Sequence, residues 1–351
     1  MPHPHEQLSP PPPAPLSAPA FQHLQSAHCE SGVITSLLRH EGLPITEAMT
    51  FGLTSALSFC YFPLVKINQL PLISYRMTPR YILNGMRRLL RLPLRYETFR
   101  SPADGTRRLD ELLAQNRPVG LQASVYFLPY FPVNMRFHFN AHNLIAYDRD
   151  PATNDYLISD PVFDKPTRSA RAELERARFV RGALAPKGLI YYIDAPIPDK
   201  DIAQVTPLLR GAIRKNAFMM LWMPIPCVGT PGIKLLASRV RRLPARTQPD
   251  FCRRFAGHIA RMQEEVGTGG AGFRFLYAAF LQEAAALLNK PTLHDLSLEL
   301  TAIGDEWRDF ATQAARQNKA RSPLDPSALA AILDDLAAKE RVFFKKLWKA
   351  A

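Results

Sequence analysis

The chain has 351 residues, 47% of them hydrophobic and 21% charged, and a formal net charge of +13. One compact core rarely serves a chain of this length, so the sequence predicts two domains. The charge predicts an acidic partner, such as anionic lipid or an acidic protein. Nucleic acid is not expected, because the basic residues are scattered pairs such as Arg107-Arg108 and belong to no recognisable nucleic-acid-binding module.

The cysteines and the N-terminal residues indicate a compartment. Four cysteines without C-x-x-C spacing predict reduced thiols in a cytoplasmic protein with no structural zinc site: Cys29, Cys60, Cys227 and Cys252. Residues 1–20 contain eight prolines and no apolar segment of the kind that a signal peptide needs, so they are predicted to be a flexible leader. The uncharged run 48–65 is broken by polar residues and Pro63, which favours a buried helix leading into a strand over a membrane span.

The first predicted element is a helix that begins within residues 26–32, carries Cys29 in its first turn and ends at Gly42. Free backbone N–H groups and the helix dipole both favour a thiolate at such a position. Because the thiolate is the nucleophilic form, Cys29 is a candidate catalytic residue. The alternative is a small buried hydrophobic residue that happens to begin a helix.

Local patterns predict further elements in the first half of the chain. Thr46 is the expected N-cap of a second helix that extends to about Leu57. Two apolar runs rich in aromatic residues follow, over 59–65 and 70–75. Two helices are predicted next, one from Thr78-Pro79 to Leu90 and an amphipathic one over 106–116. Strands are predicted over 119–125 and 188–193. Residues 196–200 are predicted to be a boundary between domains.

A strand–turn–strand pattern supplies the second set of candidate residues. Residues 138–148 and 156–161 are predicted to be strands, joined by a turn over 150–155. If the strands pair antiparallel, Asp160 lies roughly opposite His142, where the two side chains can share a hydrogen bond.

Other residues compete for the roles of His142 and Asp160. His138 competes as a base, because it lies four residues from His142 and would share its face of a regular strand. Asp148, beside the turn, and Asp164, beyond the second strand, compete for the role of the acid.

Beyond about residue 200 the pattern becomes helical. Six helices are predicted, over 202–215, 233–242, 250–265, 272–288, 293–317 and 326–349. The last has a basic amphipathic end, for which packing within its own domain is favoured over contact with a membrane or partner. The glycine-rich run 267–272 lacks the Gly-Lys-Ser/Thr ending of a phosphate loop and is predicted to be a close-packing turn. Its alternative role is to line the site with backbone N–H groups, notably those of Gly269 and Gly270.

The order of Cys29 on a helix, His142 on a strand and Asp160 on the next strand is typical of papain-like cysteine enzymes. In that arrangement the histidine takes the thiol proton, and the third residue orients the imidazole. The sequence therefore predicts an α+β protein with a leader over 1–20, a papain-like catalytic domain over 21–198 and a mostly helical domain over 199–351.

Several segments carry a resemblance to a known family. The most specific is His28-Cys29-Glu30-Ser31-Gly32, continued by 37–43, 46–49 and 51–52, and it resembles the N-terminal domain of butirosin biosynthesis protein H and its relatives. The segments around His142 and Asp160 fit the same family. Residues 267–274 and 303–308 are similar to the helical domain of unknown function that commonly follows it.

This resemblance implies acyl transfer. The named member moves an aminoacyl group from an acyl carrier protein thioester to an amine of an aminoglycoside, so the expected partners are an acidic acyl carrier protein and a small-molecule amine or alcohol acceptor. Cys29 would be the nucleophile, His142 the base and Asp160 the orienting acid. No cofactor or metal of the protein's own is expected, because the phosphopantetheine arrives on the carrier protein.

One position departs from the papain-like pattern. Six residues before the cysteine, where those peptidases carry an oxyanion-hole glutamine, this chain has His23, with Gln22 and Gln25 out of register. The backbone N–H of Cys29 is then the better candidate donor. The residues expected to bind substrate are Gln25, His28, Gly269 and Gly270.

Three functions follow from these observations. The first is an acyltransferase that passes the acyl group from Cys29 to an amine or alcohol in secondary-metabolite or lipid biosynthesis. The second is a thiol hydrolase, a peptidase or thioesterase that uses water as the acceptor. The third is a non-catalytic binding module.

Overall fold

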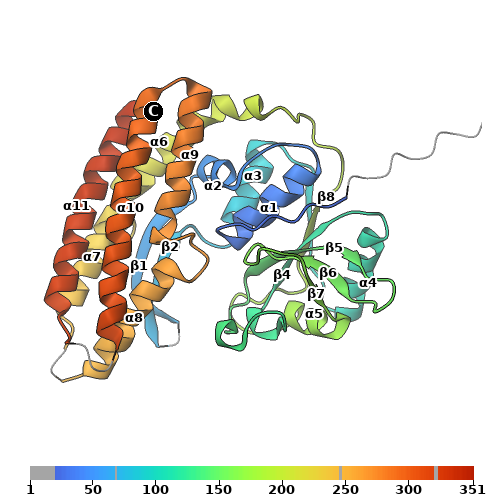
Figure 1. Cartoon of the computed structure of the whole chain (residues 1–351), viewed down its shortest axis with the longest axis horizontal. Coiled ribbons are helices and arrows are strands. Elements are labelled where there is room, and N and C mark those ends of the chain that lie inside the picture. Colours follow the sequence, from blue (N-terminus) through green and yellow to red (C-terminus); the bar gives the residue numbers. More distant parts are fainter. Residues whose placement is uncertain (1–19, 68, 245–246, 320–322) are drawn as a thin grey trace, which may run out of the picture.

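The computed structural model describes residues 20–67, 69–244, 247–319 and 323–351. The predicted leader falls outside these residues, apart from residue 20. The chain forms a half built on a β-sheet and a half built of long helices, with the first helices of the chain between them (Figure 1). The predicted α+β class, with a helical second half, is confirmed.

A six-stranded antiparallel sheet forms the first half, in the order β3-β8-β4-β5-β6-β7. Its strands are β3 (Leu94–Glu97), β4 (Val119–Ala123), β5 (His142–Arg149), β6 (Tyr156–Ser159), β7 (Thr167–Ser169) and β8 (Ile190–Ile193). The predicted antiparallel pairing of the strands around the 150–155 turn is confirmed, with Ile145 opposite Ser159. Strand β5 therefore lies in the middle of the sheet and is held from both sides.

Helices cover both faces of this sheet. The helices α4 (Pro102–Leu113) and α5 (Arg171–Arg178) pack on one face, where Leu121 and Leu144 join their core. Helix α1 (Cys29–His40) packs on the other face against Ile145. Leu144 and Ile145 are neighbours in β5, and their burial in different cores follows from the alternation of side chains along a strand.

The second half is a helical bundle with a β-hairpin packed on it. Its helices are α6 (Thr206–Trp222), α7 (Gly229–Arg241), α8 (Pro249–Glu264), α9 (Arg274–Leu288), α10 (Pro291–Asn318) and α11 (Pro326–Ala350). The hairpin of β1 (Leu57–Ile67) and β2 (Leu70–Arg76) comes from the first half of the sequence but packs on α7 and α8. One hydrophobic core includes Phe51, Tyr75 and Trp307, so the predicted boundary at residue 199 separates segments that share a core.

Several predicted bounds are wrong for identifiable reasons. Helix α2 (Glu47–Leu53) has Thr46 as its N-cap, as predicted, but ends before Leu57, which opens β1. Helix α4 begins earlier than predicted, because Ser101 caps it by accepting from Asp104 N–H and Pro102 occupies its first turn. The short elements β3, β7 and α5 were not predicted, since three to eight residues carry little periodicity.

The basic end of α11 packs into its own half. Phe343, Phe344 and Leu347 are fully buried, while Trp348 is half-exposed. Membrane contact through this helix stays a prediction. None of the helices in the described ranges combines the length and apolarity needed to cross a membrane.

Candidate active site

Cys29 is the first residue of α1, and a half-buried carboxylate holds the turn that presents it. Glu47, at the start of α2, accepts hydrogen bonds from the backbone N–H groups of Ala27 and His28 (2.8 and 2.9 Å) and from the Ser31 hydroxyl (2.8 Å). Burial raises the pKa of Glu47, although these donors act against it. The turn is thus fixed from outside α1, and the Cys29 side chain is left only 8% exposed.

His142 and Asp160 meet at one end of the strands, along the edge of the sheet where β5 begins and β6 ends. His142 opens β5 and Asp160 follows β6, and the distance from His142 Nε2 to Asp160 Oδ2 is 2.7 Å. Both side chains are buried. Asp160 also accepts from the Tyr130 hydroxyl (2.9 Å, to Oδ2) and from Val162 N–H (3.0 Å, to Oδ1). Because Nε2 is engaged by Asp160, Nδ1 is the imidazole nitrogen left for Cys29.

The charges around Cys29 favour a thiolate. Burial raises the pKa of the Cys29 thiol, but the hydrogen bond from His142 and the positive charges of His142 and Arg76 outweigh it, and the net pKa lies below the ordinary value. Burial lowers the pKa of His142, but the charge and hydrogen bond of Asp160, with those of Cys29, raise it to about 10. Both shifts act in the direction that favours a thiolate–imidazolium pair.

Asn143 adds an amide donor to the sulfur. Its Nδ2 lies 3.8 Å from Cys29 Sγ and also donates to Ala141 O (3.1 Å). The Tyr191 hydroxyl donates to Asn143 Oδ1 (2.9 Å), which fixes the orientation of the amide. Sequence reasoning missed Asn143, although a polar residue beside His142 on a central strand was a signal that could have found it.

A second carboxylate joins the catalytic turn to α3 (Tyr81–Leu89). Glu30 is fully buried, and its two oxygens accept from the backbone N–H groups of Arg80 (3.0 Å), Ile82 (2.9 Å) and Leu83 (3.1 Å). Helix α3 has no side-chain cap of its own, so Glu30 supplies the acceptors that its first turn lacks. Arg76 lies 3.5 Å from the same carboxylate.

Two residues expected near the thiol have other partners. His23 binds Ser159 Oγ (2.7 Å) and Phe163 O (3.0 Å) through its ring nitrogens, so it is tied to β6 and the loop that follows. Gln25 is exposed, and its amide donates to Val162 O (3.3 Å). His23 and Gln25 are thus both held against β6 and the loop that follows it, and the role of Gln25 in binding substrate stays a prediction.

His28 is a structural neighbour of the thiol. It is the N-cap of α1, where its Nδ1 accepts from Ser31 N–H (3.3 Å), and its ring packs edge-on against Phe273. Burial is the main cause that lowers its pKa well below the usual value, with smaller effects from the charges of Arg76 and His142. His28 is therefore neutral at physiological pH, and its role in binding substrate stays a prediction.

The competing base and acids lie outside this group. His138 precedes β5 instead of sharing its face, and it is exposed and stacked on Tyr126. Asp148 and Asp164 are both exposed. The structure thus brings Cys29, His142 and Asp160 together, whereas these three alternatives lie at the surface.

The glycine-rich loop of the helical half packs behind Cys29. A Cβ on Gly269, whose φ is +65°, would lie 2.7 Å from Ala27 Cβ, and one on Gly267 would lie 3.8 Å from His28 Cδ2. The Gly270 N–H already donates to Thr268 Oγ1 (3.1 Å). The close contacts match the predicted packing turn, and Gly270 has no N–H left for a substrate.

Comparison with protein families places this geometry in context. Residues 28–161 match the family described as "Butirosin biosynthesis protein H, N-terminal", and residues 172–347 match the "Domain of unknown function (DUF4872)". The chain belongs to the family that combines these two domains. Cys29, His142 and Asp160 all fall within the first match, and the glycine-rich loop falls within the second. No curated protein matches the chain.

Proposed function

We propose that this protein is a cysteine-dependent acyltransferase. It takes an acyl group from the thioester of an acyl carrier protein onto Cys29 and passes the group to a small-molecule amine or alcohol. The observation that carries the proposal is the hydrogen-bonded line from Asp160 through His142 to a buried thiol with a lowered pKa. Membership of a family associated with butirosin biosynthesis supports a biosynthetic enzyme.

In the first step the Cys29 thiolate attacks the thioester carbonyl, and an acyl–sulfur bond forms. The bond from the carbonyl carbon to the carrier's sulfur breaks, and the departing thiolate takes the proton from Nδ1 of the His142 imidazolium. Asp160 keeps the ring oriented through Nε2 and stabilises its positive charge.

In the second step the acceptor attacks acyl-Cys29. The neutral His142 takes a proton from the attacking amine or alcohol at Nδ1. The new amide or ester bond forms as the carbon–sulfur bond breaks, and Cys29 leaves as the thiolate beside the restored imidazolium. The thiolate, the imidazolium and the carboxylate of the starting enzyme are thus restored.

Two donors would stabilise the oxyanion of each tetrahedral intermediate. The backbone N–H of Cys29 belongs to the first turn of α1, whose amides have no acceptor within the helix. Asn143 Nδ2 approaches the same sulfur and is held by Tyr191. Such donors replace the glutamine that the sequence lacks, and each contributes on the order of 10²-fold to rates in related chemistry.

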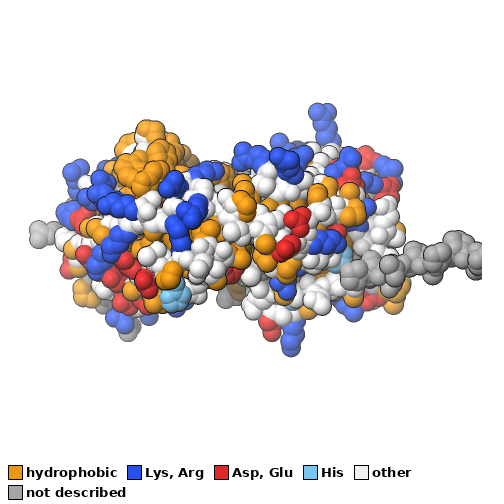
Figure 2. All heavy atoms as spheres, turned by 90° about the horizontal axis from the view of Figure 1, so that it is seen from above, with side chains coloured by type: hydrophobic (Ala, Val, Ile, Leu, Met, Phe, Trp, Pro, Cys, Tyr) orange, Lys and Arg blue, Asp and Glu red, His pale blue; other side chains and the backbone are white. Residues whose placement is uncertain are grey.

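The surface charge suits an acidic carrier protein as the donor. Lys and Arg side chains are spread over both halves of the face seen in Figure 2, and the formal net charge is +13. Complementary charge steers the encounter of two proteins and accelerates association. The phosphopantetheine then arrives as part of the substrate.

The hydrolase alternative uses the same residues with water as the acceptor. The low exposure of Cys29, 8%, argues for transfer, because a shielded acyl-enzyme is attacked by bound acceptor in preference to bulk water.

Intact-protein mass measurement tests the proposal directly. Incubation with acyl-loaded carrier protein should add the mass of one acyl group to the protein, and the Cys29→Ser variant should acquire no thioester. A candidate amine should then remove the added mass and yield the acylated amine. Loss of the added mass in buffer alone at the same rate would favour the hydrolase.

A further inference from the structure

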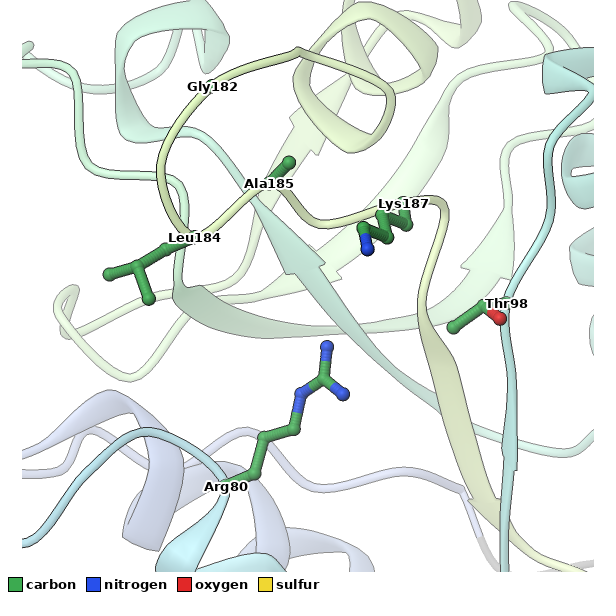
Figure 3. A pocket seen from close by; sticks show the side chains of 6 residues that line it. All are labelled: Arg80, Thr98, Gly182, Leu184, Ala185 and Lys187. Carbon is green, nitrogen blue, oxygen red and sulfur yellow. The ribbon is translucent and has the colours of Figure 1, made fainter.

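A basic cavity opens at the same edge of the sheet as the thiol. Its volume is about 490 Å³, and Figure 3 shows the residues that line it: Arg80, Thr98, Gly182, Leu184, Ala185 and Lys187. A second cavity of about 540 Å³ shares several of these residues and adds Arg100 and Arg181. Neither lining contains an acidic residue.

The cations of this cavity lack carboxylate partners. In Figure 3 the side chains of Arg80 and Lys187 point into the same space. Within the described ranges no ion pair involves the side chain of Arg80, Arg100, Arg181 or Lys187. By contrast, Arg95, Arg108 and Arg117 in the same half are all paired with Asp194 or Glu97. Converging cations without a counter-charge create a positive potential that suits an anionic ligand.

Strand register relates the cavity to the thiol. Thr98 follows β3 and Lys187 precedes β8, and the pairing of Glu97 with Ile190 places both at one edge. The pairing of Ala123 with His142 places the start of β5 at that same edge. Two strand spacings separate β8 from β5, which is roughly 10 Å.

A chain of contacts connects the two places. Arg80 Nη2 donates to Gln122 Oε1 (3.5 Å), and Gln122 pairs with Asn143 across β4 and β5. Asn143 in turn donates to Cys29 Sγ. The Arg80 backbone N–H also donates to Glu30, the residue after Cys29, while the guanidinium lines the cavity. The position of Arg80 is therefore set by the same residues that set the thiol.

We propose that this cavity binds the phosphate of the phosphopantetheine arm while the thioester lies at Cys29. The inference rests on the proposed function and assigns a subsite to its donor. Thirteen bonds separate the thioester sulfur from the phosphorus of this arm, and the extended arm is longer than the two strand spacings between β8 and β5, so the phosphate can reach the cavity when the carbonyl is at the sulfur. Arg80 offers a fork of donors, Lys187 a point charge and Thr98 a hydroxyl, which together match a tetrahedral oxyanion.

The first test measures binding without chemistry. Phosphopantetheine and pantetheine are titrated into the full-length Cys29→Ala protein by calorimetry. We expect phosphopantetheine to bind about tenfold more tightly, as is typical for a hydrogen bond to a charged group, and Lys187→Gln or Arg80→Gln to remove the difference. The matched controls Lys234→Gln and Arg88→Gln remove the same charges from exposed positions outside the cavity and should preserve it. Equal binding of both ligands overturns the inference.

The second test measures acylation of Cys29 from the same acyl group on phosphopantetheine and on pantetheine. Wild-type kcat/KM should be about tenfold higher for the phosphorylated donor, and the Lys187→Gln variant should lose this advantage while its rate with acyl-pantetheine is unchanged. If phosphopantetheine binds more tightly than pantetheine but Cys29 is never acylated, the proposed acyltransferase function is wrong and the phosphate subsite is supported. A preference that survives both cavity variants overturns the subsite.

The source of the phosphate is distinguished by a third donor. Coenzyme A presents the same phosphopantetheine without a carrier protein. With the same acyl group, the carrier-linked donor should give the higher kcat/KM, and both donors should lose activity in Lys187→Gln. Turnover with the coenzyme A thioester that equals or exceeds turnover with the carrier would overturn the assignment to a carrier arm.

Discussion

Two regions on one edge of the sheet differ in how their charges are satisfied. Around the thiol, the carboxylates of Glu30, Glu47 and Asp160 each accept several hydrogen bonds from backbone and side-chain donors. Around the cavity, Arg80 and Lys187 face open space without a carboxylate partner. Buried charges with a full set of partners fix a geometry, whereas unpaired cations at a cavity are available to a ligand. The first region positions the chemistry, and the second is where we place the donor.

The base gives the largest expected effect on the first region. His142→Ala should lower the rate of Cys29 acylation by about 10²- to 10⁴-fold, because the thiolate loses its imidazolium partner and the leaving group loses its acid. The matched control is His138→Ala, which removes an exposed histidine four residues away and should retain most of the activity. Acylation would be followed by intact mass under single-turnover conditions. A larger loss in the His138 variant would contradict this assignment.

Removing the Glu30 carboxylate, which joins the catalytic turn to α3, should lower stability as well as activity. Glu30→Gln leaves backbone N–H groups of α3 with a weaker acceptor and Arg76 without its partner, so the free energy of unfolding should fall by about 3 kcal/mol. Glu111→Gln is the control, because this exposed carboxylate only pairs with Arg108, and its loss should change stability by less than about 1 kcal/mol. Urea unfolding measures both. Equal midpoints would show that Glu30 does not hold α1 to α3.

The contact between the glycine-rich loop and the catalytic turn gives a smaller effect. Gly269→Ala introduces a Cβ 2.7 Å from Ala27 Cβ at a φ of +65°, so stability should fall by about 1–2 kcal/mol and Cys29 acylation should slow. Gly211→Ala is the control, because nothing lies within 4 Å of its Cβ position in α6, and alanine there should stabilise the helix by about 0.5–1 kcal/mol. Thermal unfolding and single-turnover acylation would be compared. Similar behaviour of the two variants would argue against a packed contact at Ala27.

Salt should change KM and kcat differently, because KM depends on exposed cations and kcat on buried groups. This is the smallest of the effects predicted here. Raising ionic strength screens the exposed cations, so KM for a carrier-bound thioester should rise several-fold, while kcat, set by buried groups, should change little. Turnover of the same acyl group on a short thiol should be lower and nearly independent of salt. Comparable rates for the two donors, both insensitive to salt, would remove the carrier protein from the proposal and favour the hydrolase.

The sequence predicted the groups whose signals are local. Cys29 opens a helix that ends near Gly42, and the strand–turn–strand pattern brings Asp160 to His142. The support for these groups was not predictable in the same way. Glu30 binds N–H groups about 50 positions away, and Tyr191 orients Asn143 across 48 positions, so no local periodicity records either contact.

The same limit applies to the fold and to the cavity. The runs that form β1 and β2 were recognised as apolar, but nothing local indicates that their hairpin packs on α7 and α8 across the predicted domain boundary. Arg80 and Lys187 both have positive φ angles, +68° and +54°, which orient their side chains. Neither residue type signals such a conformation in a sequence, because left-handed geometry favours glycine and asparagine.

The pH dependence of alkylation by iodoacetamide tests the central claim, that Cys29 is held as a thiolate by His142 and Asp160. Although Cys29 is more buried than Cys60 and Cys227, it should be alkylated first at neutral pH, at a rate that is nearly constant up to about pH 10 where His142 deprotonates. In Asp160→Asn the pKa of His142 should fall and that of Cys29 should rise, so the pH above which Cys29 is alkylated at its full rate should move upward. A Cys29 rate that rises only through pH 8–9, as for an ordinary thiol, and is unchanged in Asp160→Asn would contradict the account.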